Sequence, residues 1–425
     1  MIVCCGEALI DMVRMPFFGK KEGFLPVPGG SPYNTAIAIA RMGVPVKFLG
    51  KFSTDTFGQT LVKRLKDNKV GSDLIIRGTE NSPLALVTLG KKGKDPQYSF
   101  YTEGTANCSL KIADLPPSLP NDTRCILFGS ISMTVEPMAS SIEALLLREG
   151  SRKSTNQMDG APILSFDPNI RPFTIKDKAA YISRFEKWIA ASTIAKISAV
   201  DFAYLYPELS AEKALQKILA MGPRLAICTL GTKGALALLR QNNGSIMRVS
   251  APVVNLPVID TIGAGDAFHG ALLSWLEIKG KMSRSALVNL SESELYDALF
   301  FANKAASLVC SRQGAEPPTR KEVEALKLPV PEPKKAAAKA APKAAGKKPA
   351  LAKTAAKPVA KALAKPAAKA KGKKPAVVKA STVAKTSAKP AAAKAGGKKP
   401  VSVRAAAKPA KKALPKAAVK PGKRK

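Results

Sequence analysis

The chain has 425 residues, a formal net charge of +37, six cysteines and a single histidine. The cysteines show no CxxC or Cys/His metal spacing, so we expect reduced, buried thiols and no transition-metal site. No stretch approaches the roughly 18 apolar residues of a membrane span, and the first residues are not those of a secretion signal. We therefore expect a cytoplasmic protein that is neither exported nor membrane-spanning.

The charge is unevenly distributed and divides the chain into two parts. Residues 331–425 contain 29 Lys and Arg against one acid, Glu332. This segment repeats Ala, Lys and Pro and has no aromatic residue, so it cannot bury a core and is predicted to be disordered. We assign residues 1–328 to one large α/β domain and residues 329–425 to a basic tail.

The first part alternates short apolar runs with longer stretches of helical periodicity, which predicts βαβ units around a mainly parallel, twisted sheet. The runs predicted as buried strands are Ile2–Cys5, Cys125–Phe128, Ile163–Phe166 and Leu225–Leu230. The predicted helices are Thr35–Met42, Phe57–Lys66, Pro137–Leu147 and Ala211–Met221. Short alternating runs around 11–28 and 84–108 predict a small antiparallel β lid that excludes water.

Polar residues follow several of these strands and should converge at one edge of the sheet. Asp11 can accept hydrogen bonds from sugar hydroxyls, although an exposed loop carboxylate is the commoner case. Asn34, in Gly29-Gly30-Ser31-Pro32-Tyr33-Asn34, can donate and accept; the alternative is a turn at a helix start. Asn169 and Arg171 lie between two prolines, and the Arg171 guanidinium can neutralise phosphate oxygens. The alternative is a structural turn with an arginine at the surface.

The run Asp260-Thr261-Ile262-Gly263-Ala264-Gly265-Asp266 precedes a further apolar-periodic stretch. Its glycines let main-chain amides approach an anion at the positive end of a helix. A carboxylate such as Asp266 repels phosphate there, unless it accepts the proton of an attacking hydroxyl. The alternative is a loop whose Asp caps the helix. His269 is assigned to packing or solvent exposure.

These segments together resemble the ribokinase-like (phosphofructokinase B) sugar kinases, with bacterial fructokinases nearest. The resemblance rests on GEALID at 6–11, GGSPYN at 29–34, DPNIRP at 167–172, TLGTKG at 229–234 and DTIGAGDAFHGALL at 260–273. It covers roughly residues 1–320 and implies a three-layer α/β fold with a β lid. It also implies transfer of the ATP γ-phosphate to a hydroxyl of a neutral sugar, with fructose as the expected substrate.

The resemblance assigns roles to individual residues. Asp266 would be the base; Gly263, Ala264 and Gly265 the anion hole; and Asp11, Gly30, Asn34, Asn169 and Arg171 the sugar and phosphate contacts. ATP would lie near Thr229, Gly231, Gly234, Gly265 and Asn303. A monovalent cation, such as K⁺, would lie near Asp260, Ile262, Arg312 and Gly314.

Two departures from the family pattern bear on activity. Relatives carry a Lys and then an Asn-x-x-Glu that organises water around Mg²⁺, whereas Ala203–Leu209 offers only Glu208, one place out of register. A slow or inactive kinase that serves as a nucleic-acid-binding or regulatory scaffold is therefore the alternative function. The Tyr-Arg that often follows the lid strand is Tyr101-Thr102 here, which argues against an acidic sugar.

The basic tail resembles the C-terminal domain of linker histones. Such a segment binds DNA or another polyanion by releasing counterions, without reading sequence. It would place the protein at the nucleoid; the alternative is a solubilising extension. The lid is a candidate surface for a homodimer.

Overall fold

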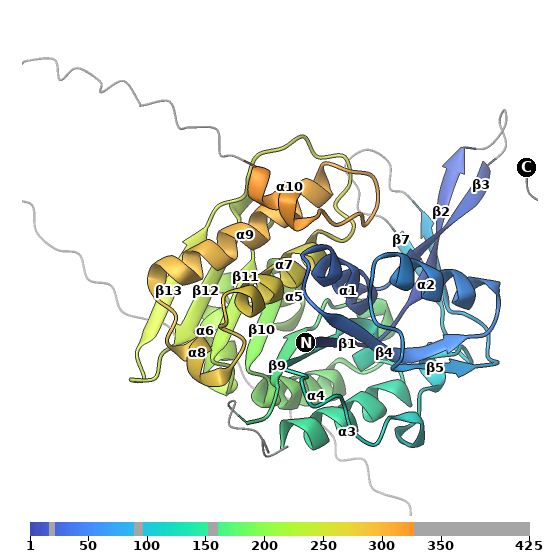
Figure 1. Cartoon of the computed structure of the whole chain (residues 1–425), viewed down its shortest axis with the longest axis horizontal. Coiled ribbons are helices and arrows are strands. Elements are labelled where there is room, and N and C mark those ends of the chain that lie inside the picture. The colour runs from blue at the N-terminus through green and yellow to red at the C-terminus, as the bar shows by residue number, and fades with distance from the viewer. Residues whose placement is uncertain (17–21, 89–96, 152–159, 327–425) are drawn as a thin grey trace, which may run out of the picture. The chain divides into compact units, whose positions relative to one another are not determined.

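The computed structural model describes residues 1–16, 22–88, 97–151 and 160–326 (Figure 1). The predicted boundary at residue 328 and the whole basic tail lie outside the described residues. Parts of both predicted lid segments, residues 17–21 and 89–96, lie outside them as well.

The main sheet carries the predicted strands and several more. Its strands are β1 Ile2–Cys5, β4 Val46–Ser53, β5 Ile75–Gly78, β8 Cys125–Gly129, β9 Ile163–Asp167, β10 Ile194–Ser198, β11 Leu225–Thr229, β12 Ala235–Arg240 and β13 Ile246–Ala251. Within the described residues their order is β13-β12-β11-β10-β9-β8-β1-β4-β5. The strands from β11 to β5 are parallel, while β12 and β13 are added antiparallel at one edge.

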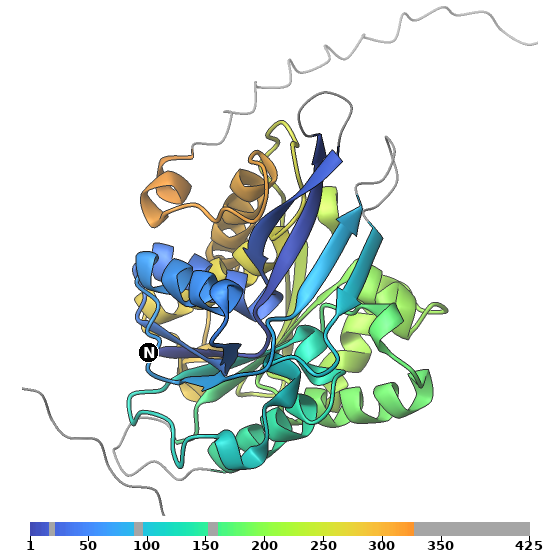
Figure 2. The same ribbon diagram turned by 90° about the vertical axis from the view of Figure 1, so that its right-hand side faces the viewer.

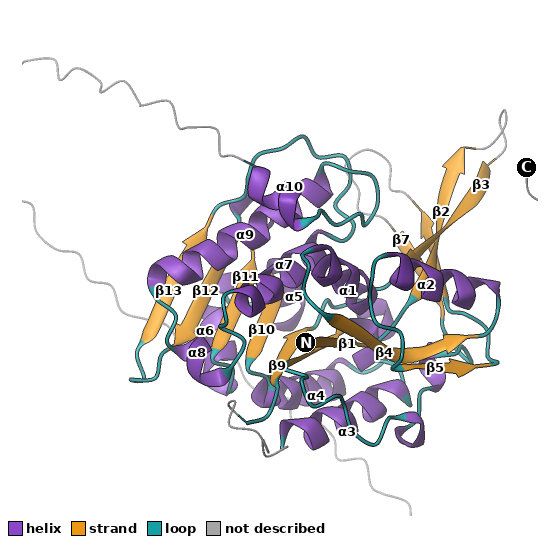
Figure 3. Ribbon diagram, viewed as in Figure 1, coloured by secondary structure: helices purple, strands orange, loops and turns teal. Residues whose placement is uncertain are grey.

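Helices cover both faces of this sheet (Figure 3). One face carries α1 Ser31–Arg41, α2 Thr56–Asp67, α7 Ala264–Ile278 and α9 Glu292–Cys310; the other carries α3 Met138–Gly150, α4 Lys178–Ala191, α5 Ala199–Leu205 and α6 Ala211–Met221. Two short helices, α8 Arg284–Val288 and α10 Arg320–Ala325, complete the α-helices of the described residues. None of the helices in the described ranges is long and apolar enough to cross a membrane.

Successive side chains of a strand point to opposite faces of the sheet, which explains why the sheet has a hydrophobic core on each face. In β1, Ile2 and Cys4 belong to the core beneath α1 and α7, whereas Val3 and Cys5 belong to the core beneath α3 and α4. Every side chain of the strand is buried, as expected for a parallel sheet that is covered on both faces. The result is the predicted three-layer α/β fold.

A second sheet forms the lid. Its strands are β2 Leu9–Pro16, β3 Glu22–Gly29, β6 Leu84–Thr88 and β7 Gln97–Tyr101, in the order β3-β2-β6-β7. Figure 2 shows these strands projecting beyond the main sheet. The pairs β2–β3 and β6–β7 are antiparallel as predicted, but β2 and β6 run parallel, which the sequence did not indicate.

Strand order creates a crevice beside β1. From β1 the chain moves outward to β4 and β5, and it then returns to the other side of β1 for β8 and the strands that follow. The connections after β1 and β8 therefore leave in opposite directions. At such a switch point the carboxyl ends of the strands are open to a ligand.

Candidate active site

A cavity of about 270 Å³ lies at this crevice. Its walls combine the segment after β1, the lid, the start of α1 and the turn before α7. It is lined by Glu7, Leu9, Asp11, Gly30, Ser31, Asn34, Phe100, Ser130, Ile131, Asn169, Arg171, Thr261, Ile262, Gly263, Gly265 and Asp266. The structure thus brings together predicted residues from four of the five motifs.

Asp266 lies in the first turn of α7 and is held from both sides. One carboxylate oxygen accepts a hydrogen bond from Ser31 Oγ at 2.7 Å, and the other accepts one from Asn34 Nδ2 at 3.0 Å. Burial raises the pKa of Asp266, while these two hydrogen bonds oppose the rise. The side chain is therefore oriented by α1, and it does not serve as a side-chain cap of its own helix.

The turn before α7 has the geometry of an anion-binding site. Gly263 precedes the helix with φ of 78°, a left-handed conformation that favours glycine, and a Cβ there would lie 2.7 Å from Ala315 Cβ. The amide of Ala264 makes a long hydrogen bond of 3.3 Å to the Thr261 carbonyl. Within the described residues the amides of Gly265 and Asp266 have no acceptor, so they can meet an anion.

Asp11 and Arg171 bring opposite charges to the same cavity. Burial raises the pKa of Asp11 to about 7; the Arg171 guanidinium opposes this rise and Asp266 adds to it. A Cβ at Gly29 would lie 2.2 Å from Asp11 Oδ2, so the neighbouring strand leaves room for the carboxylate only because position 29 is glycine. Arg171 Nη1 donates to Asn169 Oδ1 at 2.9 Å, which orients both side chains.

The cavity also contains residues to which the sequence alone assigned no individual role. Glu7 is 2% exposed, and its carboxylate accepts from the backbone amides of Ser31 and Ser132, both at 3.2 Å. Phe100 of the lid stacks on Phe173 of the main domain, with ring centroids 5.1 Å apart. The position of Glu7 directly after the first strand was the available signal. The aromatic pair joins segments that are far apart in the sequence, so no sequence signal pointed to it.

The residues predicted to lie near ATP converge at a different place. Thr229 ends β11, and Gly231 and Gly234 flank the turn that follows it. A Cβ at Gly234 would lie 2.1 Å from the Ala251 carbonyl oxygen, and Asn303 Nδ2 donates to that same oxygen at 2.9 Å. Apart from Gly265, these residues do not line the cavity around Asp266.

Three of the predicted cation-binding residues, Asp260, Ile262 and Gly314, lie close together. Asp260 accepts from the amide of Ile262 at 3.0 Å and from the amide of Gly314 at 2.9 Å. Its carboxylate therefore ties the turn before α7 to the loop after α9. The Arg312 side chain is itself a cation and pairs with Glu322 of α10, so this residue can offer a bound cation only its backbone carbonyl.

Glu208, the predicted Mg²⁺ residue, is exposed in the turn after α5 and does not line the cavity. The carboxylate at the carboxyl end of β10 is Asp201 instead, 5% exposed and hydrogen-bonded to the amides of Ser198 and Ile170. Ser198 and Asp201 have the spacing of an Asn-x-x-Glu, with Ser for Asn and Asp for Glu. From the sequence, the element was placed at Ala203–Leu209 instead, because β10 was not predicted.

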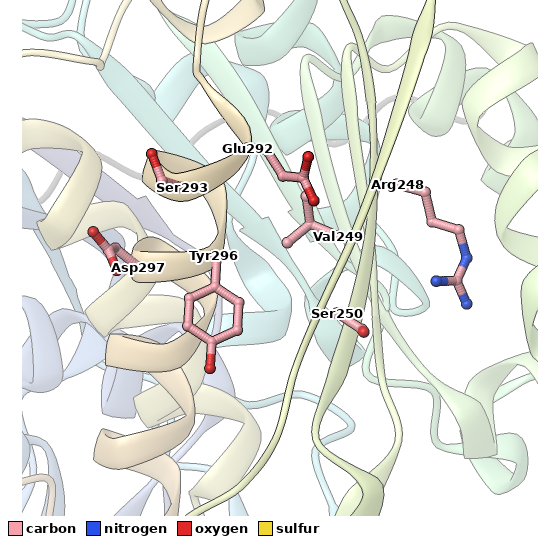
Figure 4. A pocket seen from close by; sticks show the side chains of 7 residues that line it. All are labelled: Arg248, Val249, Ser250, Glu292, Ser293, Tyr296 and Asp297. Atoms are coloured by element: carbon pink, nitrogen blue, oxygen red, sulfur yellow. The ribbon is translucent and has the colours of Figure 1, made fainter. Parts of the chain in front are cut away.

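A larger hollow of about 660 Å³ lies between β13 and α9 (Figure 4). It is lined by Arg248, Val249, Ser250, Glu292, Ser293, Tyr296 and Asp297. It is shallow and exposed, and Figure 4 shows the Arg248 side chain directed away from α9. Arg248 pairs with Glu212 on α6, so no set of polar groups converges here on a ligand.

A doubly wound sheet with a β lid, and a carboxylate beside the free amides of a helix start, fit a small-molecule kinase. Residues 1–322 match the family described as "pfkB family carbohydrate kinase". The chain belongs to that family and is a carbohydrate kinase.

Curated relatives and solved structures agree with this assignment. A fructokinase of Rhizobium leguminosarum bv. trifolii is 34% identical over 295 residues, which are 69% of this chain and 85% of the relative. Fructokinase-1 of Oryza sativa subsp. japonica is 30% identical over 77% of this chain and 97% of its own length. The structure of Xylella fastidiosa fructokinase with bound ATP superposes with a TM-score of 0.66 at 27% identity, covering 76% of this chain and 96% of that one.

Proposed function

We propose that the chain transfers the γ-phosphate of ATP to a hydroxyl of fructose. One observation carries the proposal: Asp266, oriented by Ser31 and Asn34, shares a cavity with the free amides of the turn before α7. A sugar hydroxyl that reaches Asp266 would lose its proton to this carboxylate as its oxygen attacks phosphorus. The amide of Gly265 would stabilise the charge on the transferring phosphoryl group.

The charges of the cavity favour a neutral sugar. Three of its lining residues, Glu7, Asp11 and Asp266, are carboxylates, and Arg171 is the cation among the lining residues. A sugar acid would add a further negative charge to this set and be repelled, whereas hydroxyls can donate to Asp11 and accept from Asn34. The choice of fructose as the substrate rests on the relatives. The structure of a fructokinase from Vibrio cholerae O395 holds fructose, ADP and a calcium ion.

ATP, Mg²⁺ and a monovalent cation remain proposals for this chain. The clustering of Gly234 and Asn303 around the Ala251 carbonyl supports a nucleotide site beyond the turn before α7. Buried Asp201 fits a group that holds water around Mg²⁺ better than exposed Glu208 does. For the cation, a double mutant of the Vibrio cholerae fructokinase is recorded with potassium. Asp260 and nearby carbonyls offer the oxygen ligands that such an ion prefers.

A coupled assay of ADP release tests the proposed reaction. Wild-type protein is offered ATP with fructose, glucose, mannose, ribose and gluconate, each with and without added Mg²⁺ and K⁺. We expect turnover on fructose, weaker turnover on other neutral sugars and none on gluconate. Turnover on gluconate above that on fructose would contradict the charge argument. A complete lack of turnover would support the scaffold function instead.

We further propose that the basic tail binds DNA or another polyanion and places the protein at the nucleoid. The support is the sequence of residues 331–425, with 29 cationic side chains and one acid. If about ten lysines contact phosphates, log affinity falls with log salt at a slope near −9. A gel-shift series compares the full chain with residues 1–328; equal retardation of both would contradict the proposal.

The lid as a homodimer surface is tested by the molar mass in solution.

A further inference from the structure

Behind the anion-binding turn lies a buried group of charges that the proposed reaction does not use. Lys196 Nζ, on β10, donates to Asp167 Oδ2, on β9, at 2.7 Å, and the two side chains are only 4% and 5% exposed. His269 of α7 lies against this pair, with its Nδ1 3.7 Å from Asp167 Oδ2 and its Nε2 2.7 Å from Ser165 Oγ. His269 is fully buried, so of the two expected roles, packing and solvent exposure, the structure shows packing.

The ion pair lies directly beneath the turn. A Cβ built on Gly265 would be 3.1 Å from Lys196 Nζ, so the ammonium group lies close to the main chain that carries the free amides. Gly265 lines the cavity, whereas Lys196 is not among the residues that line it. Any effect on the reaction must therefore pass through Gly265 or through the electric field at Asp266.

A buried ion pair is weak evidence for stability, because desolvating two charges costs about as much as their attraction returns. The Asp167 carboxylate keeps the pKa of Lys196 above its usual range although burial alone would lower it. Burial lowers the pKa of His269, so this ring is neutral. The net charge of the cluster is therefore zero, with one positive and one negative group close to Asp266.

We propose that the Lys196–Asp167 pair is a positioning and charge-balancing device for the anion-binding turn, holding Gly265 in place and keeping Asp266 ionised during catalysis. The inference deepens the proposed function and depends on Asp266 acting as the base. Lys196 is thus a positioning residue, since it does not line the cavity in which the substrate would react.

The sign of the effect follows from the charges that face Asp266. The Asp167 carboxylate raises the pKa of Asp266 and the Lys196 ammonium lowers it. The ionisable or charged groups on the neighbouring elements are Glu7 after β1, Asp11 on β2, Asp167 on β9, Arg171 after β9, Lys196 on β10, Asp201 on α5 and His269 on α7. Most of these groups are acids, so losing the one buried ammonium should leave Asp266 harder to ionise.

The test is the pH profile of kcat for the full chain with ATP and fructose. In Lys196→Met, the Asp167 carboxylate loses its partner, and we expect the acid limb to move up by about one pH unit or more. The kcat should recover toward wild type at high pH. Lys196→Met/Asp167→Asn removes both charges and should return the limb toward wild type. Asp167→Asn alone leaves the cation and should move the limb to lower pH.

Arg184→Met is the matched control. Arg184 forms a partly buried ion pair with Glu143 between α4 and α3, in the outer helix layer. Losing that pair should lower thermal stability without moving the acid limb.

The outcomes separate the two proposals. A wild-type chain without turnover on any sugar would remove the proposed function itself. With an active wild type, a kcat that falls equally at every pH in Lys196→Met would reduce the pair to a structural role. Should Lys196→Met fail to fold, Asp167→Asn decides, because an unmoved or raised acid limb in that variant also overturns the inference.

Discussion

Replacing Asp266 by Asn is the sharpest test of the candidate site. The substitution keeps the shape of the side chain and removes its charge and its capacity to take a proton. The acceptor of the Asn34 Nδ2 hydrogen bond, 3.0 Å in the structure, becomes an amide that can place a donor there instead. Orientation and proton transfer are therefore disturbed together, while the cavity keeps its volume.

The expected loss follows from the role assigned to the carboxylate. General-base catalysis contributes roughly 10²- to 10⁴-fold, which corresponds to about 3–5 kcal/mol of transition-state stabilisation. Stability should move the other way. Burial raises the pKa of Asp266, so at pH 8 its ionised form costs folding free energy that Asn does not. The variant should unfold at the same temperature as wild type or at a higher one.

The measurements are kcat and KM for fructose and for ATP by coupled ADP release, with a melting curve at pH 8. Asp297→Asn, at the exposed hollow on α9, is the control and should leave all of these values unchanged. A kcat for Asp266→Asn within tenfold of wild type would refute the assignment of the base. A large fall in melting temperature would refute the argument about its burial.

Three further predictions concern the surroundings of the base. Burial raises the pKa of Asp11 to about 7, so KM for sugar should fall as the pH rises from 6 to 8 and this carboxylate ionises. If the KM of Asp11→Asn showed the same pH dependence, this assignment would be contradicted. Gly263→Ala forces a Cβ to 2.7 Å from Ala315 Cβ at φ of 78°, whereas Gly280→Ala meets open space at φ of 68°. Both variants should lose about 1–2 kcal/mol of unfolding free energy in urea because of the left-handed backbone. Gly263→Ala should lose more than this, because its Cβ meets Ala315, and only this variant should have a lower kcat. Asn303→Ala removes the donor from the buried Ala251 carbonyl and from the partly buried Pro252 carbonyl, and it should lower stability by about 1–3 kcal/mol while raising KM for ATP. An unchanged KM would separate Asn303 from the nucleotide site.

The sequence alone determined those features that depend on near neighbours in the chain. Uninterrupted apolar runs mark strands that are buried on both faces, and Ala211–Met221 was predicted with its observed bounds. Glycines 263 and 265 and the acid at 266 already describe an anion-binding helix start. These patterns arise from backbone sterics and side-chain periodicity, which act over a few residues.

β10 was missed because Lys196 interrupts its apolar run, and the register of Ser198 and Asp201 was lost with it. A lysine in a buried strand becomes acceptable only because Asp167, 29 residues away, supplies its counter-charge. The parallel pairing of β2 with β6 and the stacking of Phe100 on Phe173 likewise depend on which segments meet.

The catalytic geometry belongs to the tertiary structure as well. Ser31 and Asp266 are 235 positions apart in the chain, yet their side chains are hydrogen-bonded at 2.7 Å. Local chemistry named most of the residues of the site, whereas the packing of α1 against α7 decided which of them touch. The direction and protonation of a buried carboxylate depend on partners that only the folded chain brings together.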